Sequence, residues 1–143
     1  MFNKSLKNTA EWAVEYALKS GATEAASYLA NVKSLNLTLL NEKIEKLQES
    51  NQNSLSLDIY CNNKYSSHST NDLREDSLKK FIEEAVKMTN FLAKDDARML
   101  PDRSLYPGRD MLNKELDLFD TTYESIDFKD KFSFAIKLYE SIK

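Results

Sequence analysis

The chain has 143 residues, of which 41% are hydrophobic and 30% are charged, and its formal net charge is −3 at pH 7. This length fits one domain with a core of ordinary size. Acidic and basic residues are interleaved, so the chain lacks the clustered positive charge that a nucleic-acid backbone attracts, and we expect no direct nucleic-acid contact.

The single cysteine, Cys61, excludes an internal disulfide. No apolar run approaches the roughly 20 residues that span a bilayer, and the first residues lack the apolar core of a signal peptide. We therefore expect a cytoplasmic protein with no membrane contact.

Three segments show apolar residues at the three- and four-residue spacings of amphipathic helices. The first predicts a helix over residues 3–20 that stops at Gly21, with Trp12 and Tyr16 packed in the core. The second predicts a helix over residues 75–93 with Asp72 as its cap. The third predicts a helix over residues 126–143. Its expected buried side comprises Phe128, Phe132, Ala135, Ile136, Tyr139 and Ile142.

Between residues 24 and 70 the pattern changes to a period of two, which predicts strands. The alternating apolar positions are Ala26, Tyr28, Ala30 and Val32, then Leu35, Leu37 and Leu39, and then Leu55, Leu57, Ile59 and Cys61. Asparagine tolerates the left-handed turn conformation, so we expect strand breaks at Asn41–Glu42, Asn51 to Asn53 and Asn62–Asn63. The predicted fold class is α/β, more narrowly α+β: an antiparallel β-meander with one wet face, packed against helices on the other.

A loop is predicted over residues 94–124, which contain Pro101, Pro107 and Gly108. The helical pattern is still running at Ile142 and Lys143. We therefore interpret residues 1–143 as a single N-terminal domain of a longer protein, with a C-terminal domain outside this sequence.

The sequence offers little for a complete catalytic or metal site. His68 is the only histidine, and we expect it to point to the face of the hairpin opposite to Cys61. Zinc needs three or four converging ligands, and a nucleophile needs a base and an orienting group, so neither site is expected. Two glycines cannot form a phosphate-binding loop or a dinucleotide fingerprint. The carboxylate pairs Asp95–Asp96 and Asp117–Asp120 are interpreted as solvated. We predict no catalytic residue, no metal ligand and no cofactor in this chain.

One stretch of sequence is specific enough to indicate a family. Gly21 opens G-A-T-E-A-A-S-Y, residues 41–50 read N-E-K-I-E-K-L-Q-E-S, and residues 53–73 end in S-T-N-D-L. With L-P-D at residues 100–102 and D-L-F-D at residues 117–120, this order resembles the N-terminal domain of the TldD/PmbA family, on its PmbA-like side. Members are also labelled modulators of DNA gyrase. Family glycines are replaced here by Ser54, Ser56, Asn63 and Ser66, which leaves open any contact that uses bare backbone.

The resemblance implies a protein with a larger β-rich second domain that forms homo- or heterodimers with a TldD/PmbA-type subunit. Such pairs act as zinc-dependent proteases on peptides. The H-E-x-x-x-H zinc motif belongs to TldD-type subunits, and none of its positions lies in these residues. Zinc would therefore belong to the full-length protein or to its partner, and this chain alone is expected to be inactive.

We therefore expect this domain to line a substrate chamber and to help pair subunits. An exposed strand of the meander could accept an extended peptide by edge pairing. The predicted peptide-contact residues are Tyr60, Tyr65 and Ser67, which lie on two-faced strands beside a hairpin. The alternative is a non-enzymatic structural or protein-interaction module.

Overall fold

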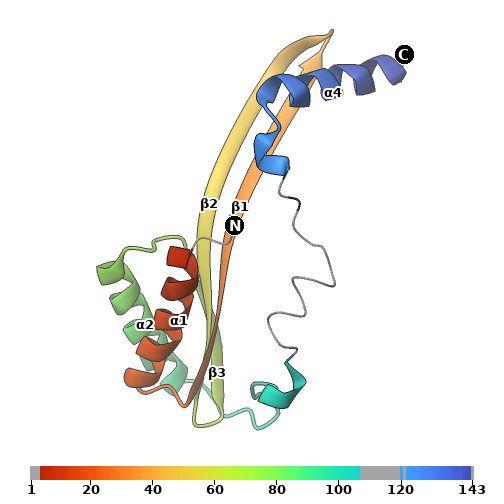
Figure 1. Cartoon of the computed structure of the whole chain (residues 1–143). Coiled ribbons are helices and arrows are strands. Elements are labelled where there is room, and N and C mark those ends of the chain that lie inside the picture. Colours follow the sequence, from red (N-terminus) through yellow and green to blue (C-terminus); the bar gives the residue numbers. More distant parts are fainter. Residues whose placement is uncertain (1–3, 107–119, 121, 143) are drawn as a thin grey trace. The chain divides into compact units, whose positions relative to one another are not determined.

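The computed structural model describes residues 4–106, 120 and 122–142. Among these residues it contains α1 (Lys4–Lys19), β1 (Glu24–Leu40), β2 (Lys43–Cys61), β3 (Lys64–Thr70), α2 (Glu75–Asn90), two short 3-10 turns (Arg103–Leu105 and Tyr123–Ser125) and α4 (Phe128–Ser141). The strands form one sheet in the order β1-β2-β3 (Figure 1). The predicted α+β fold with an antiparallel meander is confirmed. Much of the predicted loop over residues 94–124, including Pro107, Gly108 and Asp117, lies outside the described residues.

Two-residue turns connect the three strands. Asn41 and Glu42 have φ angles of 48° and 65°, and Asn62 and Asn63 have φ angles of 51° and 65°. A positive φ at both central positions matches the turn to the right-handed twist of its strands, and asparagine reaches this conformation at modest cost.

The expected break at Asn51 to Asn53 is wrong, because β2 continues from Lys43 to Cys61 without interruption. Asparagine permits a turn but does not require one when its side chain finds a partner inside the sheet. Here Asn31 Nδ2 donates a hydrogen bond to Asn53 Oδ1 across the strands at 2.7 Å.

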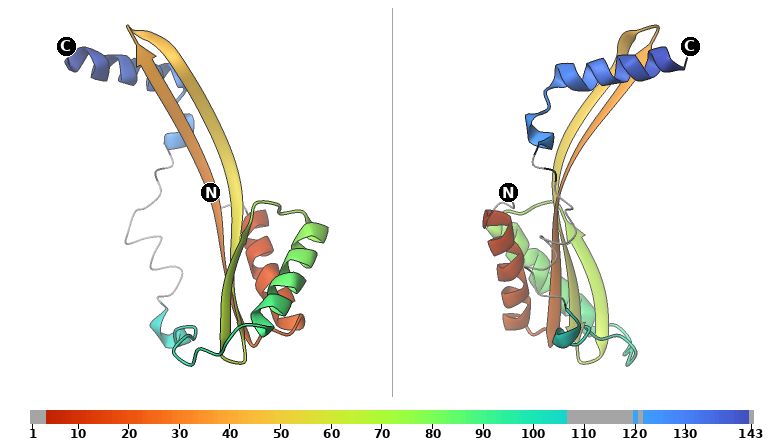
Figure 2. Two further views of the ribbon diagram at one scale, coloured as in Figure 1. Left: turned by 180° about the vertical axis from the view of Figure 1, so that it is seen from behind. Right: turned by 45° about the vertical axis from the view of Figure 1, so that its right-hand side comes forward.

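The chain divides into two compact units. Among the described residues, the helix-covered unit comprises residues 4–32 and 52–103, and the hairpin unit comprises residues 33–51, 104–106, 120 and 122–142. In the helix-covered unit, α1 and α2 lie side by side on one face of the sheet (Figure 2). Its buried core includes Ala13, Ala17, Leu55, Leu57, Ile59, Cys61, Leu78, Ile82, Ala85 and Val86. Truncating one of the large members of such a core to alanine typically costs about 2–5 kcal/mol.

Aromatic side chains join the two helices of this unit. The rings of Trp12 and Tyr16 stack at 5.2 Å, and both pack against the core. The Tyr16 hydroxyl donates to Glu83 Oε1 at 2.7 Å, which connects α1 to α2.

The apolar face of β1 differs from the expected one. Ala25 and Leu29 pack against the core, whereas Tyr28 is 70% exposed and Val32 is 56% exposed. The series Ala26, Tyr28, Ala30 and Val32 therefore faces away from the helices. Alanines lie on both faces of this strand, so the sequence pattern has little contrast. The expected apolar face followed the large side chain of Tyr28, which points away from the helices.

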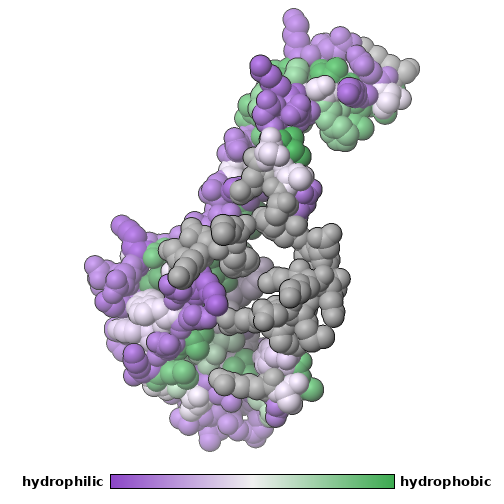
Figure 3. All heavy atoms as spheres, in the orientation of Figure 1, coloured by the Kyte–Doolittle hydropathy of each residue, from purple (hydrophilic) through white to green (hydrophobic). Residues whose placement is uncertain are grey.

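In the hairpin unit, α4 begins at a well-formed cap, since the Asp127 side chain accepts a hydrogen bond from the Asp130 backbone N–H at 2.9 Å. The expected buried side of this helix is only partly correct. Phe132, Ala135, Ile136 and Tyr139 are half-buried, but Phe128 and Ile142 are exposed, and no α4 residue in the described part of the chain is fully buried. Apolar patches remain visible over α4 in Figure 3.

None of the helices among the described residues is both long and apolar enough to cross a membrane.

Candidate functional site

The sheet face opposite α1 and α2 carries all three predicted contact residues. The β2–β3 register pairs Tyr60 with Tyr65 and Asp58 with Ser67. The intervening residues of β2 are buried under the helices. Because successive side chains of a strand point to opposite faces, these four residues lie on the other face, which we call the open face.

Direct contacts connect the residues of the open face. The rings of Tyr60 and Tyr65 lie 5.0 Å apart with an interplanar angle of 45°. The Tyr65 hydroxyl donates to Asp58 Oδ1 at 3.1 Å. Burial raises the pKa of the Tyr60 phenol, and Tyr65 and Asp58 raise it further. Tyr60 therefore stays neutral and able to donate a hydrogen bond across the physiological range.

Sequence reasoning missed Arg98, which lies against the same cluster. Its guanidinium carbon is 4.7 Å from the centre of the Tyr65 ring, and its Nε is 3.4 Å from Asp95 Oδ2. A guanidinium over an aromatic face is attracted by the negative charge density of the ring. The one sequence signal was the neighbouring pair Asp95–Asp96, which is exposed as expected but also forms hydrogen bonds and an ion pair.

Both of these carboxylate residues help to fix the segment that carries Arg98. The Asp95 backbone N–H donates to Asn63 O at 2.6 Å, and Asn63 Nδ2 donates to Asp96 Oδ1, also at 2.6 Å. The Asp95 side chain accepts from the Ala97 backbone N–H at 3.1 Å. These bonds hold the segment after α2 against the turn between β2 and β3.

A surface cavity lies at the start of β3. It is lined by Tyr65, Ser66, Leu92, Ala93, Lys94, Asp95 and Arg98. Tyr65 points to the open face, whereas Ser66 points toward the helices and bonds to Thr89. A cavity that touches two consecutive residues of a strand must straddle the edge of that strand. We call it the edge cavity.

One side of β3 carries backbone groups that do not bond to β2. Within the described residues β3 is an end strand of the sheet. Cys61 and Lys64 close its two-residue hairpin, and such a closing pair is hydrogen-bonded. Bonding then alternates along β3, so Tyr65, Ser67 and Ser69 direct their backbone N–H and C=O groups away from β2.

The helix-facing side of β3 contains a chain of hydroxyl groups that ends on α2. Thr89 Oγ1 donates to Ala85 O at 2.7 Å, and Ser66 Oγ lies 2.5 Å from Thr89 Oγ1. His68 Nε2 lies 2.8 Å from Ser66 Oγ. Each hydroxyl has one proton, so Ser66 donates to Thr89 and accepts from His68 Nε2. This arrangement satisfies the fully buried Thr89 and uses the lone histidine as a structural donor.

The expectation that His68 and Cys61 point to opposite faces is wrong. His68 pairs with Leu57, and Cys61 pairs with Lys64, so both side chains face the helices. A two-residue turn places odd-numbered β2 residues opposite even-numbered β3 residues, which the sequence spacing alone did not reveal. Burial raises the pKa of the Cys61 thiol, so it is a poor nucleophile.

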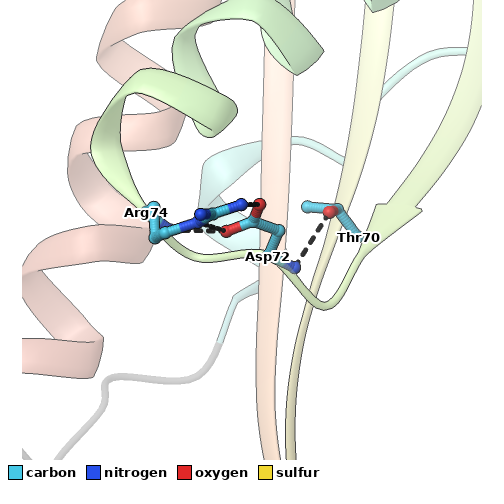
Figure 4. Close-up of polar contacts among 3 residues, drawn as sticks. All are labelled: Thr70, Asp72 and Arg74. Carbon is cyan, nitrogen blue, oxygen red and sulfur yellow. Dashed lines mark hydrogen bonds and ion pairs between the residues drawn. The ribbon is translucent and has the colours of Figure 1, made fainter.

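The turn after β3 is ordered by the family-like motif at Ser69 to Leu73 (Figure 4). Thr70 Oγ1 accepts from the Asp72 backbone N–H at 3.1 Å, and Asp72 Oδ1 accepts from the Arg74 backbone N–H at 3.1 Å. The Arg74 guanidinium donates to both carboxylate oxygens of Asp72. Hydrogen bonds from Arg74 hold the pKa of Asp72 well below its usual range. The prediction that Asp72 caps α2 is wrong, because Arg74 is the N-cap residue and Asp72 forms the turn before it.

Among the described residues there is no group of three or more histidine, cysteine, aspartate or glutamate side chains placed to hold a metal ion.

Comparison with known proteins relates this domain to one family. Residues 25–89 match the model of PmbA/TldA metallopeptidase domain 1. The chain is 28% identical over 102 residues to a protein of Haemophilus influenzae named metalloprotease PmbA homolog, an alignment that covers 71% of this chain and 22% of that protein.

Two solved structures share the fold. A protein of Bacteroides thetaiotaomicron that carries the name modulator of DNA gyrase matches with a TM-score of 0.83 and 35% identity over 99% of this chain and 31% of its own. TldE from Thermococcus kodakarensis matches with a TM-score of 0.58 and 14% identity over 66% of this chain and 21% of its own, a likeness of fold alone. The chain spans less than a third of the length of each of these relatives.

Proposed function

Since this chain carries the first domain of the PmbA/TldD family, we propose that it forms part of the wall of a peptide-binding chamber. In this proposal an extended peptide adds to β3 as a further strand. The observation that carries the proposal is the edge of β3, where Tyr65 and Ser67 present backbone groups beside the Tyr60–Tyr65 ring pair. Main-chain hydrogen bonds would supply affinity, and the side-chain contacts would supply selectivity.

The proposed role includes binding and excludes bond cleavage by this chain. Zinc is the metal that the family implies, and it requires three or four ligands on converging geometry. Among the described residues, no group of three or more histidine, cysteine, aspartate or glutamate side chains is placed to supply those ligands. The reactive centre would lie in another domain or in a paired subunit of the same family, identical or different, and the proposed chamber would form between them.

A direct test is to titrate the isotopically labelled 143-residue chain with short extended peptides and follow its NMR spectrum. The proposal predicts shifts at Tyr65, Ser67 and Tyr60. Tyr65→Ala should weaken binding several-fold, since aromatic contact residues commonly contribute more than about 1 kcal/mol. Tyr28→Ala is the matched control, because it removes an exposed tyrosine of the same face from the opposite edge strand.

Absence of shifts along β3 at saturating peptide would refute the proposal. It would favour the alternative of a structural or protein-interaction module. Shifts confined to β1 would show that the peptide uses the other edge.

A further inference from the structure

We infer that the edge cavity recognises the C-terminal carboxylate of a peptide that runs antiparallel to β3. This inference rests on the proposed function and adds the direction of the peptide and the chemistry of its end. Three independent features of the cavity lead to it: its place on the strand, its charge and its apolar lining.

The place of the cavity sets which end of the peptide reaches it. β3 runs from Lys64 to Thr70, and the cavity adjoins Tyr65 and Ser66 at its beginning. The sheet is antiparallel, and antiparallel pairing is slightly more stable per residue than parallel pairing. A strand added in this sense passes Ser69, then Ser67, then Tyr65, so its C-terminal end arrives at the cavity.

The charge of the cavity favours an anion. Its lining contains two cationic side chains, Lys94 and Arg98, and one carboxylate, Asp95. The guanidinium of Arg98 has five N–H donors. Its contact with Asp95 is through Nε, and the terminal nitrogens carry four more donors. A carboxylate can accept two parallel hydrogen bonds from such a fork.

Arg98 is already oriented for this contact. The Tyr65 ring lies on one side of its guanidinium, and Asp95 holds Nε. Asp95 is itself tied to the hairpin turn through Asn63. A side chain that is ordered before binding loses less conformational entropy when the ligand arrives, so the existing contacts favour recognition.

The apolar part of the lining indicates the last side chain of the peptide. The Tyr65 ring, Leu92 and Ala93 form this part. An apolar C-terminal residue would bury its side chain there while its carboxylate meets Arg98 and Lys94. The expected ligand class is therefore an extended peptide with a free carboxyl end and an apolar last residue.

The test compares three peptides of one sequence that ends in leucine. The first has a free C-terminal carboxylate, the second a C-terminal amide, and the third the same amide with an internal glutamate. The free acid should bind the 143-residue chain about tenfold more tightly than either amide, the size expected for one charged hydrogen-bonded contact. Arg98→Gln should remove most of that difference, and Arg98→Lys should keep only part of it.

Lys80→Gln is the matched control, since it removes an exposed positive charge from α2 outside the cavity. It should leave the preference for the free acid unchanged. An NMR spectrum of each variant that matches the parent outside the cavity shows that the fold is kept.

The outcomes separate this inference from the proposed function. Equal binding of acid and amide, with shifts along β3, would overturn the carboxylate inference and leave strand addition standing. Tight binding of the glutamate-containing amide would show that the cavity reads acidic side chains instead. Binding of none of the peptides would refute both.

Discussion

Single polar residues near the end of β3 determine how the chain turns into α2. Thr70, Asp72 and Arg74 form a local network in which the Asp72 carboxylate receives one backbone and two guanidinium hydrogen bonds. The residues that most resemble the family motif therefore have a structural role here. This role explains why an aspartate is suited to the position without invoking catalysis.

A pH titration of stability tests this role of Asp72. Its pKa is lowered in the folded chain, chiefly by hydrogen bonds from Arg74. The stabilisation is therefore complete above the unfolded value of about 3.9 and is lost progressively as the pH falls below it. In urea unfolding, Asp72→Asn should be less stable than the parent at pH 7, and this difference should narrow toward low pH.

Asp76→Asn is the control, because it removes an exposed carboxylate from the first turn of the same helix without touching the network. The decisive range extends down to pH 2.5, a value well below the ordinary aspartate pKa of about 3.9. If the difference in unfolding free energy between Asp72→Asn and the parent stayed constant over this range, the stabilising role of the Asp72 carboxylate would be contradicted.

At the scale of elements, the two-residue turn at Asn62 and Asn63 sets which residues face the helices and which form the open face. The substitution Asn62→Ala is the sharpest probe of that turn, because Asn62 has a positive φ angle of 51°. A left-handed conformation costs alanine roughly 1–2 kcal/mol and costs glycine almost nothing. Asn62→Ala should lower the free energy of unfolding by about 1 kcal/mol, and the matched Asn62→Gly should change it by less than about 0.5 kcal/mol.

Chemical denaturation of the three proteins provides the comparison. If Asn62→Ala and Asn62→Gly were equally stable, the turn would not have the positive φ that fixes the register.

The sequence predicted these elements unevenly, for physical reasons. The helices α1 and α2 were predictable because the apolar residues on one face of each helix contrast with charged neighbours. The inward face of β1 was not, because alanine occurs on both faces and carries little signal. A strand break was predicted at Asn53 because asparagine favours turns. In the structure its side chain instead bonds to Asn31 on the neighbouring strand, a partner that the sequence does not indicate.

Only part of the candidate site was predictable in the same way. Tyr60, Tyr65 and Ser67 were identified from strand alternation beside a hairpin, and the structure places them on one face. Arg98 was not identified, because its approach to Tyr65 depends on bonds between the segment after α2 and the turn at Asn63. Contacts between segments so far apart in sequence have no local pattern.

At the scale of the whole molecule, the layers of the helix-covered unit differ in what they contribute. The helices and the buried side of β2 supply stability, and the proposed peptide contacts lie on the open face and at the edge of β3. The single histidine and single cysteine both belong to the helix-facing side. Neither side chain lies on the open face, where the proposed peptide contacts are.

Amide hydrogen exchange along β3, with and without a saturating extended peptide, tests peptide addition most directly. In the free chain the amides of Ser66 and His68 should exchange slowly, because they bond to β2, while those of Tyr65, Ser67 and Ser69 exchange quickly. Peptide should slow the second set by at least about tenfold, since each newly bonded amide must open before it can exchange. Unchanged exchange at Tyr65, Ser67 and Ser69, with peptide shown to be bound, would contradict strand addition.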